Sequence, residues 1–194
     1  GYLRRYASAQ ATFTLFVRDC LQRNYFVAAG LDEALDILAR LRFTDSDLSY
    51  LKKTGMLPGD FLDYLKKFRF NGRIRALPEG TIFFPEEPVL ELTAPAAEAQ
   101  VVETLLINCV GFQTLIASKA VRCVHSAGGR PLVDFSLRRT QGYDAGMKVA
   151  RSTYLGGFSA TSNVAAGKRF GIPIAGTMAH SFVTAFENET AAFD

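Results

Sequence analysis

The last third of the chain alternates between two hydrophobic patterns, and this alternation constrains the fold most. Short apolar runs typical of buried strands occur at Leu132–Phe135, Tyr154–Phe158 and Ile172–Gly176. Helical patterns separate them at Gly142–Thr153 and Thr161–Phe170. Parallel strands need a crossover connection, so this order predicts a parallel sheet or barrel made of βα units. Ligands bind at the carboxyl ends of the strands in such folds.

The first 95 residues combine helices with short strands. Leu31–Leu41 has apolar residues at helical spacing, Thr44 begins a capping signal, and Pro58 opens a third helix. Alternating apolar residues predict strands at Thr12–Phe16, Tyr25–Ala29, Ile74–Leu77, Thr81–Phe84 and Val89–Thr93. We therefore expect an α+β domain over residues 1–95, and long core helices followed by the first βα units of a barrel over residues 96–194.

A long apolar pattern begins the second part. From Ala96 to Val124, apolar side chains recur every four residues, as a helix requires. A membrane-spanning helix needs about 20 consecutive apolar residues. Polar or charged residues interrupt this pattern at Glu103, Asn108, Gln113, Lys119 and Arg122. We therefore predict a core helix, or two helices with a break near Gly111, and no membrane span.

Composition narrows the class of protein. Hydrophobic residues make up 48% of the 194 residues, as in a globular protein with one good core or two small ones. The net charge of +3 is spread along the chain, which favours acidic small-molecule ligands over nucleic acid. Cys20, Cys109 and Cys123 match no zinc or redox spacing, so we expect reduced thiols in a cytoplasmic protein and name no metal ligand. The amino terminus shows no signal-peptide pattern.

Two groups of polar side chains follow predicted strands at their carboxyl ends. Arg138 and Arg139 come after the first strand, and a guanidinium fork binds two phosphate or carboxylate oxygens at once. On extended backbone, two adjacent side chains point in opposite directions, so we expect one arginine to face a site. His180 follows the third strand, between the hydroxyls of Thr177 and Ser181. Together, these groups at neighbouring strand ends predict a binding or catalytic site.

Structural alternatives exist for each candidate. His180 could be a buried histidine bonded to a backbone carbonyl, and one arginine could form a salt bridge or a subunit contact. His125 lies near the end of the long helix, where we expect it to cap carbonyls or face solvent. Gly156–Gly157 is expected to close the middle strand. A hydroxyl side chain is then expected to cap the next helix, from Ser159, Thr161 or Ser162.

The segments that carry these residues resemble one enzyme family. DFSLRRTQGYDAG, YLGGFSATSNVAAGKRFGIP and GTMAHSF are similar to segments of nicotinate phosphoribosyltransferases. The earlier segments YFVAAGLDEALDIL, FLDYLKKFRFNG, LPEGTIFFPEEPVLEL and AEAQVVETLLINCVGFQTLIASKA resemble the same family in the same order. LRRTQG and GTMAHSF are the most specific of these. Ser136 is one departure, because many relatives have Gly there.

The resemblance implies a fold and an activity. The fold is α/β of the type II phosphoribosyltransferase kind, an N-terminal α+β domain followed by the first part of an irregular α/β barrel. The implied reaction joins nicotinate and phosphoribosyl pyrophosphate into nicotinate mononucleotide and pyrophosphate, coupled to ATP hydrolysis with Mg²⁺. The resemblance also implies NAD biosynthesis in the cytoplasm, by a homodimer with site residues from both subunits.

The resemblance further implies residue roles. His180 would be phosphorylated by ATP, and Arg138 would take part in catalysis and substrate binding. Thr177 would contact nicotinate, with Ser181 close by. The remaining implied substrate-binding positions are Leu137, Gly176 and, as a weaker correspondence, Arg139.

Other functions stay open at this point. A related phosphoribosyltransferase acting on quinolinate or nicotinamide would share much of the pattern. A non-catalytic truncated fragment is the alternative from a different class. Members of the family carry further site residues before the equivalent of Gly1 and after the equivalent of Asp194, so we expect these 194 residues alone not to complete the reaction.

Overall fold

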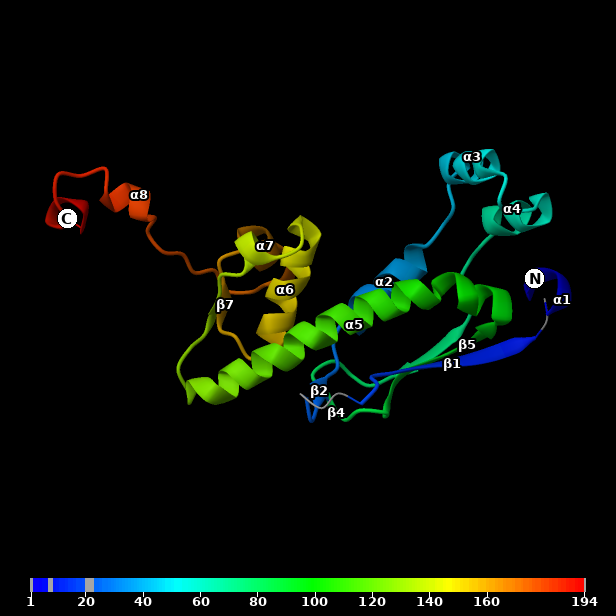
Figure 1. The fold of residues 1–194 in the computed structure, drawn as a ribbon, viewed down its shortest axis with the longest axis horizontal. Helices are drawn as coiled ribbons and strands as arrows, with labels where there is room; N and C mark the ends of the chain where they lie inside the picture. The colour runs from blue at the N-terminus through cyan, green and yellow to red at the C-terminus, as the bar shows by residue number, and fades with distance from the viewer. Residues whose placement is uncertain (1, 7–8, 20–22, 194) are drawn as a thin grey trace.

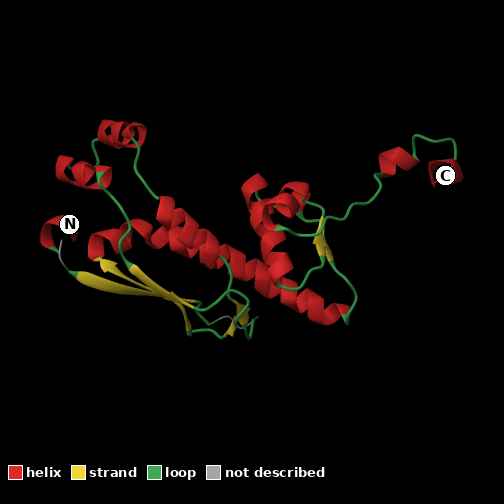
Figure 2. Ribbon diagram, turned by 180° about the vertical axis from the view of Figure 1, so that it is seen from behind, coloured by secondary structure: helices red, strands yellow, loops and turns green. Residues whose placement is uncertain are grey.

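The computed structural model describes residues 2–6, 9–19 and 23–193. The molecule is elongated, and the helix α5 (Ala96–Ala127) runs through its middle (Figure 1). An antiparallel sheet lies along one half of α5, and two helices with a short parallel strand pair lie along the other half (Figure 2). The C-terminal residues extend past this second half as an arm (Figure 1).

The elements before α5 are α1 (Tyr2–Arg5), β1 (Gln10–Phe16), β2 (Phe26–Val27), α2 (Leu31–Arg40), α3 (Asp45–Thr54), α4 (Gly59–Lys66), β3 (Arg73–Ala76), β4 (Ile82–Phe83) and β5 (Pro88–Pro95). The elements after it are β6 (Val133–Asp134), the 3-10 helix η1 (Leu137–Arg139), α6 (Tyr143–Leu155), β7 (Ala160–Thr161), α7 (Val164–Phe170), α8 (His180–Val183) and α9 (Glu189–Phe193). The five strands and three helices expected in the first 95 residues are confirmed, although β2 and β4 are shorter than expected.

The antiparallel sheet covers one side of α5. Its strand order is β1-β5-β3, and its register places Phe13 and Ile74 on either side of Leu92. Side chains alternate across a strand, so these three share one face. That face packs in the main core with α5 and α2. On the other face the hydroxyls of Thr12 and Thr93 lie 2.8 Å apart.

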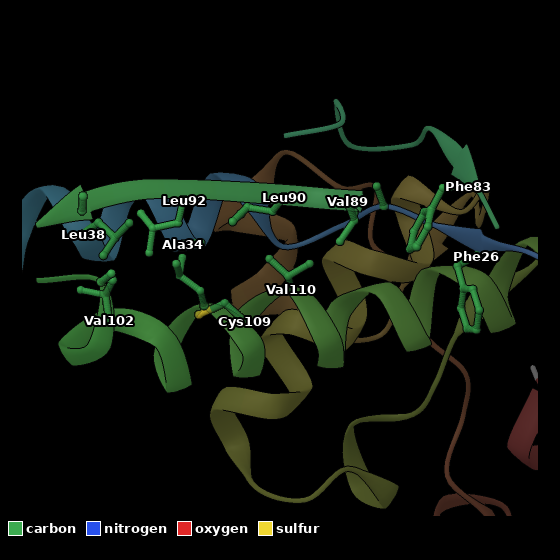
Figure 3. Packing of buried hydrophobic residues seen from close by; sticks show 14 of the residues in the cluster. Phe26, Ala34, Leu38, Phe83, Val89, Leu90, Leu92, Val102, Cys109 and Val110 are labelled. Atoms are coloured by element: carbon green, nitrogen blue, oxygen red, sulfur yellow. The ribbon is translucent and has the colours of Figure 1, made fainter. Parts of the chain in front are cut away.

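One side of α5 supplies the other half of this core. Val102, Cys109 and Val110 lie on the side of α5 that faces Leu90 and Leu92 of β5 (Figure 3). The helix is continuous through its glycine at position 111, so the alternative of two helices is wrong. By length and composition α5 could cross a membrane. Its buried side chains instead form the core beneath the sheet and a smaller cluster around Ala117, as in a core helix.

The cap of α3 forms as the sequence predicts. The Thr44 hydroxyl accepts the Asp47 N–H at 3.2 Å, and the Asp47 carboxylate accepts the Thr44 N–H at 2.8 Å. These two bonds satisfy amide groups that the first helical turn leaves free. The helix has no buried residue, so its ends and its contact with α4 hold it in place.

The second half contains the expected parallel units. β6 and β7 are parallel neighbours, and Thr161 forms a further parallel bridge with Ile174. The helices α6 and α7 connect these segments, which confirms the predicted alternation of strand and helix. The described residues form an open strip of parallel segments rather than a closed barrel.

Two strand predictions in this half were wrong. Tyr154 lies in the last turn of α6, Gly156 caps the end of that helix instead of closing a strand, and β7 begins only at Ala160. The run from Tyr154 to Phe158 is too short for its apolar pattern to distinguish a strand from the end of a helix. The strand expected at Ile172–Gly176 is reduced to the single bridge at Ile174.

The predicted cap of α7 was also wrong. Asn163 caps this helix, because its Oδ1 accepts the Ala166 N–H at 3.1 Å. The Thr161 hydroxyl is used elsewhere, as described below. The division of the chain at residues 95 and 96 stays a prediction, since α5 starts at Ala96 and packs against elements of both parts.

Candidate functional site

The parallel segments place two chain exits at one edge. β6 ends at Asp134, β7 ends at Thr161, and Ile174 pairs with Thr161 in the same direction. Because parallel strands end on the same side of a sheet, the segments after Asp134 and Ile174 leave from one edge. The first segment carries Arg138, and the second carries Thr177. We take this edge as the candidate functional site.

Buried hydrogen bonds fix the edge. Asp134 is 4% exposed, and Thr161 is 0% exposed. The Thr161 hydroxyl donates to Asp134 Oδ2 at 2.9 Å, and Asp134 Oδ1 accepts the Ser136 N–H at 3.0 Å. The Thr161 N–H donates to the Pro173 carbonyl at 3.0 Å, and the Thr161 carbonyl accepts the Ala175 N–H at 3.1 Å. Thr161 therefore joins the exit of β6 to the segment that precedes Gly-Thr-Met-Ala-His.

The arginines lie in η1, on a tight turn at this edge. Adjacent residues of a 3-10 helix are about 120° apart, so the expectation of opposite directions on extended backbone was wrong. Arg138 and Arg139 are both exposed. Leu137 is half-buried and packs on bare backbone of α6, because a Cβ on Gly146 would lie 2.3 Å from Leu137 Cδ1. The turn is thus anchored through Leu137 and open to solvent at its arginines.

The second predicted group lies farther out. Gly176 and Thr177 are exposed and belong to no regular element, and His180 and Ser181 begin α8. Figures 1 and 2 show α8 on the arm, beyond β7. His180 is exposed, so the alternative of a buried histidine bonded to a carbonyl is wrong. The parallel segments bring η1 and the start of this segment to one edge, whereas His180 and Ser181 lie in α8 on the arm (Figure 1).

The sequence pattern alone does not reveal the roles of four residues at this edge. Asp134 and Asn163 are not predicted as site residues, although a polar residue directly after an apolar run is the available signal for a strand end. Thr161 was considered as a helix cap, not as a link between strands. Phe135 was also passed over, and it is 44% exposed between β6 and η1. Its apolar character predicts burial in a strand, so exposure is visible only in the structure.

A charged cluster joins the two halves elsewhere. Arg151 of α6 bonds both carboxylate oxygens of Glu79, with Nη1···Oε1 at 3.2 Å and Nη2···Oε2 at 2.5 Å. Glu79 Oε1 also accepts the Gly30 N–H at 2.6 Å. Burial favours a raised pKa of Glu79, but the Arg151 fork and hydrogen bonds from the Gly30 and Asp32 N–H groups hold that pKa below its ordinary value. Burial likewise opposes the charge on Arg151, yet Glu79 raises the pKa of Arg151.

A cavity of about 690 Å³ lies between α2, α5, α6 and α7, beside this cluster. Its charges include Lys148 and Glu33, which pair at 3.2 Å, and Gln113 donates to the same glutamate at 2.7 Å. The charges of Lys148 and Glu33 thus offset each other there. In the part of the chain that the structure describes, no group of three or more His, Cys, Asp or Glu side chains could hold a metal ion. Cys109 is buried and Cys123 exposed, both as free thiols, while Cys20 lies outside the described residues.

Comparison with solved structures defines the class of fold. The crystal structure of human nicotinic acid phosphoribosyltransferase matches with a TM-score of 0.87 and 38% identity, over 95% of this chain and 38% of that chain. A nicotinate-nucleotide pyrophosphorylase from Pyrococcus furiosus shares the fold at a TM-score of 0.74 and 21% identity, over 98% of this chain and 42% of that chain. The α+β domain, the long core helix and the parallel units therefore form a phosphoribosyltransferase fold, as expected.

Sequence comparison gives the family. The nicotinate phosphoribosyltransferase (NAPRTase) N-terminal domain profile matches residues 1–111, and the NAPRTase family profile matches residues 131–193. The chain therefore belongs to the nicotinate phosphoribosyltransferase family.

Curated relatives agree with this family. Nicotinate phosphoribosyltransferase pncB2 of Mycobacterium tuberculosis is 47% identical over all of this chain, and the Bacillus subtilis enzyme is 45% identical over 95% of it. The chain spans 42% and 38% of the lengths of these two relatives.

Proposed function

We propose that the protein containing this chain converts nicotinate and phosphoribosyl pyrophosphate into nicotinate mononucleotide and pyrophosphate, for NAD biosynthesis. The observation that carries the proposal is the similarity, over 100% and 95% of this chain, to proteins named for this activity, at 47% and 45% identity. The open edge beyond β6 adds physical support. It presents exposed guanidinium groups on a fixed turn, as binding of phosphate-rich substrates requires.

The glycosyl step places specific demands on the site. The bond between the ribose anomeric carbon and the pyrophosphate oxygen breaks, and a bond from that carbon to the pyridine nitrogen forms. Negative charge grows on the leaving pyrophosphate, and the Arg138 fork would stabilise it without reorganising. Arg139 is the second candidate on the same turn. Leu137 would act as their anchor at the substrate site, since it packs on α6.

Nicotinate would bind between the two exits of the edge. The exposed Phe135 ring offers a face for stacking on the pyridine ring. The Thr177 hydroxyl would donate to the nicotinate carboxylate, and Gly176 beside it lets backbone approach the ligand closely. Ser181 would lie at the outer side of the same site.

We propose His180 as the residue that couples ATP hydrolysis to this reaction. A lone pair of the imidazole attacks the γ-phosphorus, the bond from that phosphorus to the oxygen of the ADP leaving group breaks, and water later hydrolyses the P–N bond to release phosphate. The exposure of His180 makes its ring accessible to a nucleotide. Mg²⁺ belongs to the proposal through the family resemblance. The described residues supply no cluster of ligands for it, so we assign no step to a metal.

The proposal extends to assembly and location. We propose a cytoplasmic homodimer whose site contains residues from both subunits. The open edge supports this proposal, because Arg138, Arg139 and Phe135 are exposed there and could be contacted by residues of a second chain that complete the site.

Phosphoryl transfer tests the role of His180. The full-length protein, with His180→Ala and with the matched control His125→Ala, is incubated with ATP labelled at the γ-phosphate. His125 is also exposed and lies in the last turn of α5. We expect label on the wild type and on the control, and none on His180→Ala. Equal labelling of all three proteins would refute the role.

A base-specificity assay tests the reaction itself. Nicotinate, quinolinate and nicotinamide are each supplied with phosphoribosyl pyrophosphate, and mononucleotide formation is measured. We expect turnover of nicotinate, and a loss with Arg138→Ala and with Arg138→Lys, because lysine lacks the planar fork. Preference for another base would support a related phosphoribosyltransferase, and no product from any base would support a non-catalytic chain.

A further inference from the structure

We propose that Asp134 and Thr161 are positioning residues that hold the Arg138 turn in its substrate-binding geometry. The inference rests on the proposed function, which places Arg138 in the substrate site. It concerns Asp134, which bonds the N–H of Ser136 at the start of the turn, and Thr161, which bonds Asp134; neither is proposed to contact the substrate.

The burial of Asp134 is the first observation. Burying a carboxylate is unfavourable unless hydrogen bonds satisfy it. Asp134 is only 4% exposed and lies at the end of the two-residue strand β6. Its two oxygens bond in different directions. Oδ1 accepts the N–H of Ser136 two residues later, and Oδ2 accepts the hydroxyl of Thr161 on the neighbouring strand. The first bond turns the chain out of β6, and the second fixes the carboxylate itself.

Thr161 connects this carboxylate to a wider network. Its hydroxyl donates to Asp134 and also accepts the Asn163 N–H at 3.1 Å. Asn163 in turn caps α7. The backbone of Thr161 bonds Pro173 and Ala175 on the other side. Both Asp134 oxygens and the Thr161 hydroxyl have partners in this buried network, whereas the Ser136 hydroxyl is buried without one. Buried hydrogen bonds of this kind restrict motion, so a displacement of Thr161 would shift both exits of the edge.

The link from this network to the arginines is short. Ser136 donates its N–H to Asp134, and its carbonyl accepts the Arg139 N–H at 2.7 Å. The Ser136 peptide groups therefore connect the carboxylate directly to η1. Without the Asp134 bond, the Ser136 N–H would lose its link to β6, and a shift of Ser136 would displace Arg138 with it. A misplacement of about 1 Å in a positioning group can lower a rate about 100-fold.

Matched valine substitutions provide the test in the full-length protein. Thr161→Val removes the linking hydroxyl, and Thr161→Ser restores it. Thr153→Val is the control, because the Thr153 hydroxyl is also buried but bonds only the Ala150 carbonyl of its own helix, at 3.0 Å. Asp134→Asn is a milder second variant that keeps an acceptor for Ser136. Steady-state kinetics are measured well below each melting temperature.

We expect Thr161→Val to lower kcat/KM for phosphoribosyl pyrophosphate about 10- to 100-fold. Thr161→Ser should recover most of this loss, and Thr153→Val should keep kcat/KM within about twofold of wild type. The kcat/KM of Asp134→Asn should lie between those of wild type and Thr161→Val. Combined with Arg138→Ala, the Thr161→Val change should add no further loss, because it acts through the arginine. Equal losses in both valine variants, or losses that multiply with Arg138→Ala, would overturn the proposal.

Amide hydrogen exchange separates this inference from the proposed function. If Asp134 and Thr161 position the turn, Thr161→Val should speed exchange at residues 136–140, and Thr153→Val should leave it unchanged. Wild-type protein that uses none of the three bases would refute the proposed function, whatever the exchange result. Unchanged exchange in Thr161→Val would refute the positioning role even in an active enzyme.

Discussion

The bidentate pair between Glu79 and Arg151 should hold the two halves of the chain together, and Arg151→Met tests this directly. Methionine keeps much of the length and apolar stem of arginine but removes its fork. The Glu79 carboxylate would keep the Gly30 N–H and lose both bonds to α6. Asp32 also lies 2.7 Å from Arg151, but it is mostly exposed and contributes little.

The size of the effect follows from burial. The side chains of Arg151 and Glu79 are 21% and 10% exposed. Removing one partner of a fully buried pair costs about 3–5 kcal/mol. The residual exposure of the pair and the remaining hydrogen bond from the Gly30 N–H reduce this cost. We therefore expect Arg151→Met to lower the free energy of unfolding by about 2–3 kcal/mol. Glu79→Gln keeps an acceptor for Gly30, and its expected loss is about 1–2 kcal/mol.

Urea unfolding of wild type, both single variants and the double variant measures these free energies. The pair predicts that the double variant loses less than the sum of the single losses, by about 1–2 kcal/mol. Additive losses, or a loss below about 0.5 kcal/mol for Arg151→Met, would refute the reasoning.

The same pair predicts a pH dependence with a definite sign. The folded-state pKa of Glu79 lies below its unfolded value, which is about 4.3. Its contribution is therefore fully present above the unfolded pKa and is lost as the pH falls through the folded pKa. The stability difference between wild type and Arg151→Met should be constant from about pH 7 to pH 5 and should shrink below about pH 4. A difference that grows on acidification would contradict this assignment.

Three further predictions concern stability and reactivity. Gly30→Ala should lose about 3 kcal/mol in urea unfolding, because Gly30 has φ +95° and a Cβ there would lie 2.4 Å from the Cys109 carbonyl oxygen; a neutral change would contradict the close approach. Thr44→Ala should lose about 1 kcal/mol through the α3 cap, whereas Ser49→Ala on the exposed side of the same helix should not. Thiol labelling of native protein, followed by peptide mass spectrometry, should modify Cys123 first, since burial raises the pKa of the Cys109 thiol; faster labelling of Cys109 would contradict its burial.

Local chemistry determined much of this structure in advance. The capping box at Thr44, the helical spacing of Leu31–Leu41 and the alternating strands each depend on neighbours within a few residues, so the sequence alone predicts them. The order of apolar runs likewise predicts the parallel βα units, because a helix between strands makes the return parallel. The candidates Arg138 and Thr177 were found in the same way, from their places after apolar runs.

Contacts between distant segments decided the rest. Whether Tyr154 ends a helix or starts a strand depends on which partner its neighbours meet, and a five-residue apolar run does not encode that. The sequence by itself determined the family, the element order and the residues that carry charge at the strand ends. Only the tertiary structure decided that Thr161 bonds Asp134 across two strands and that Arg151 bonds Glu79. The first pair is 27 positions apart in the sequence, and the second pair is 72 positions apart. Such pairings are fixed by packing of whole elements, which no local pattern contains.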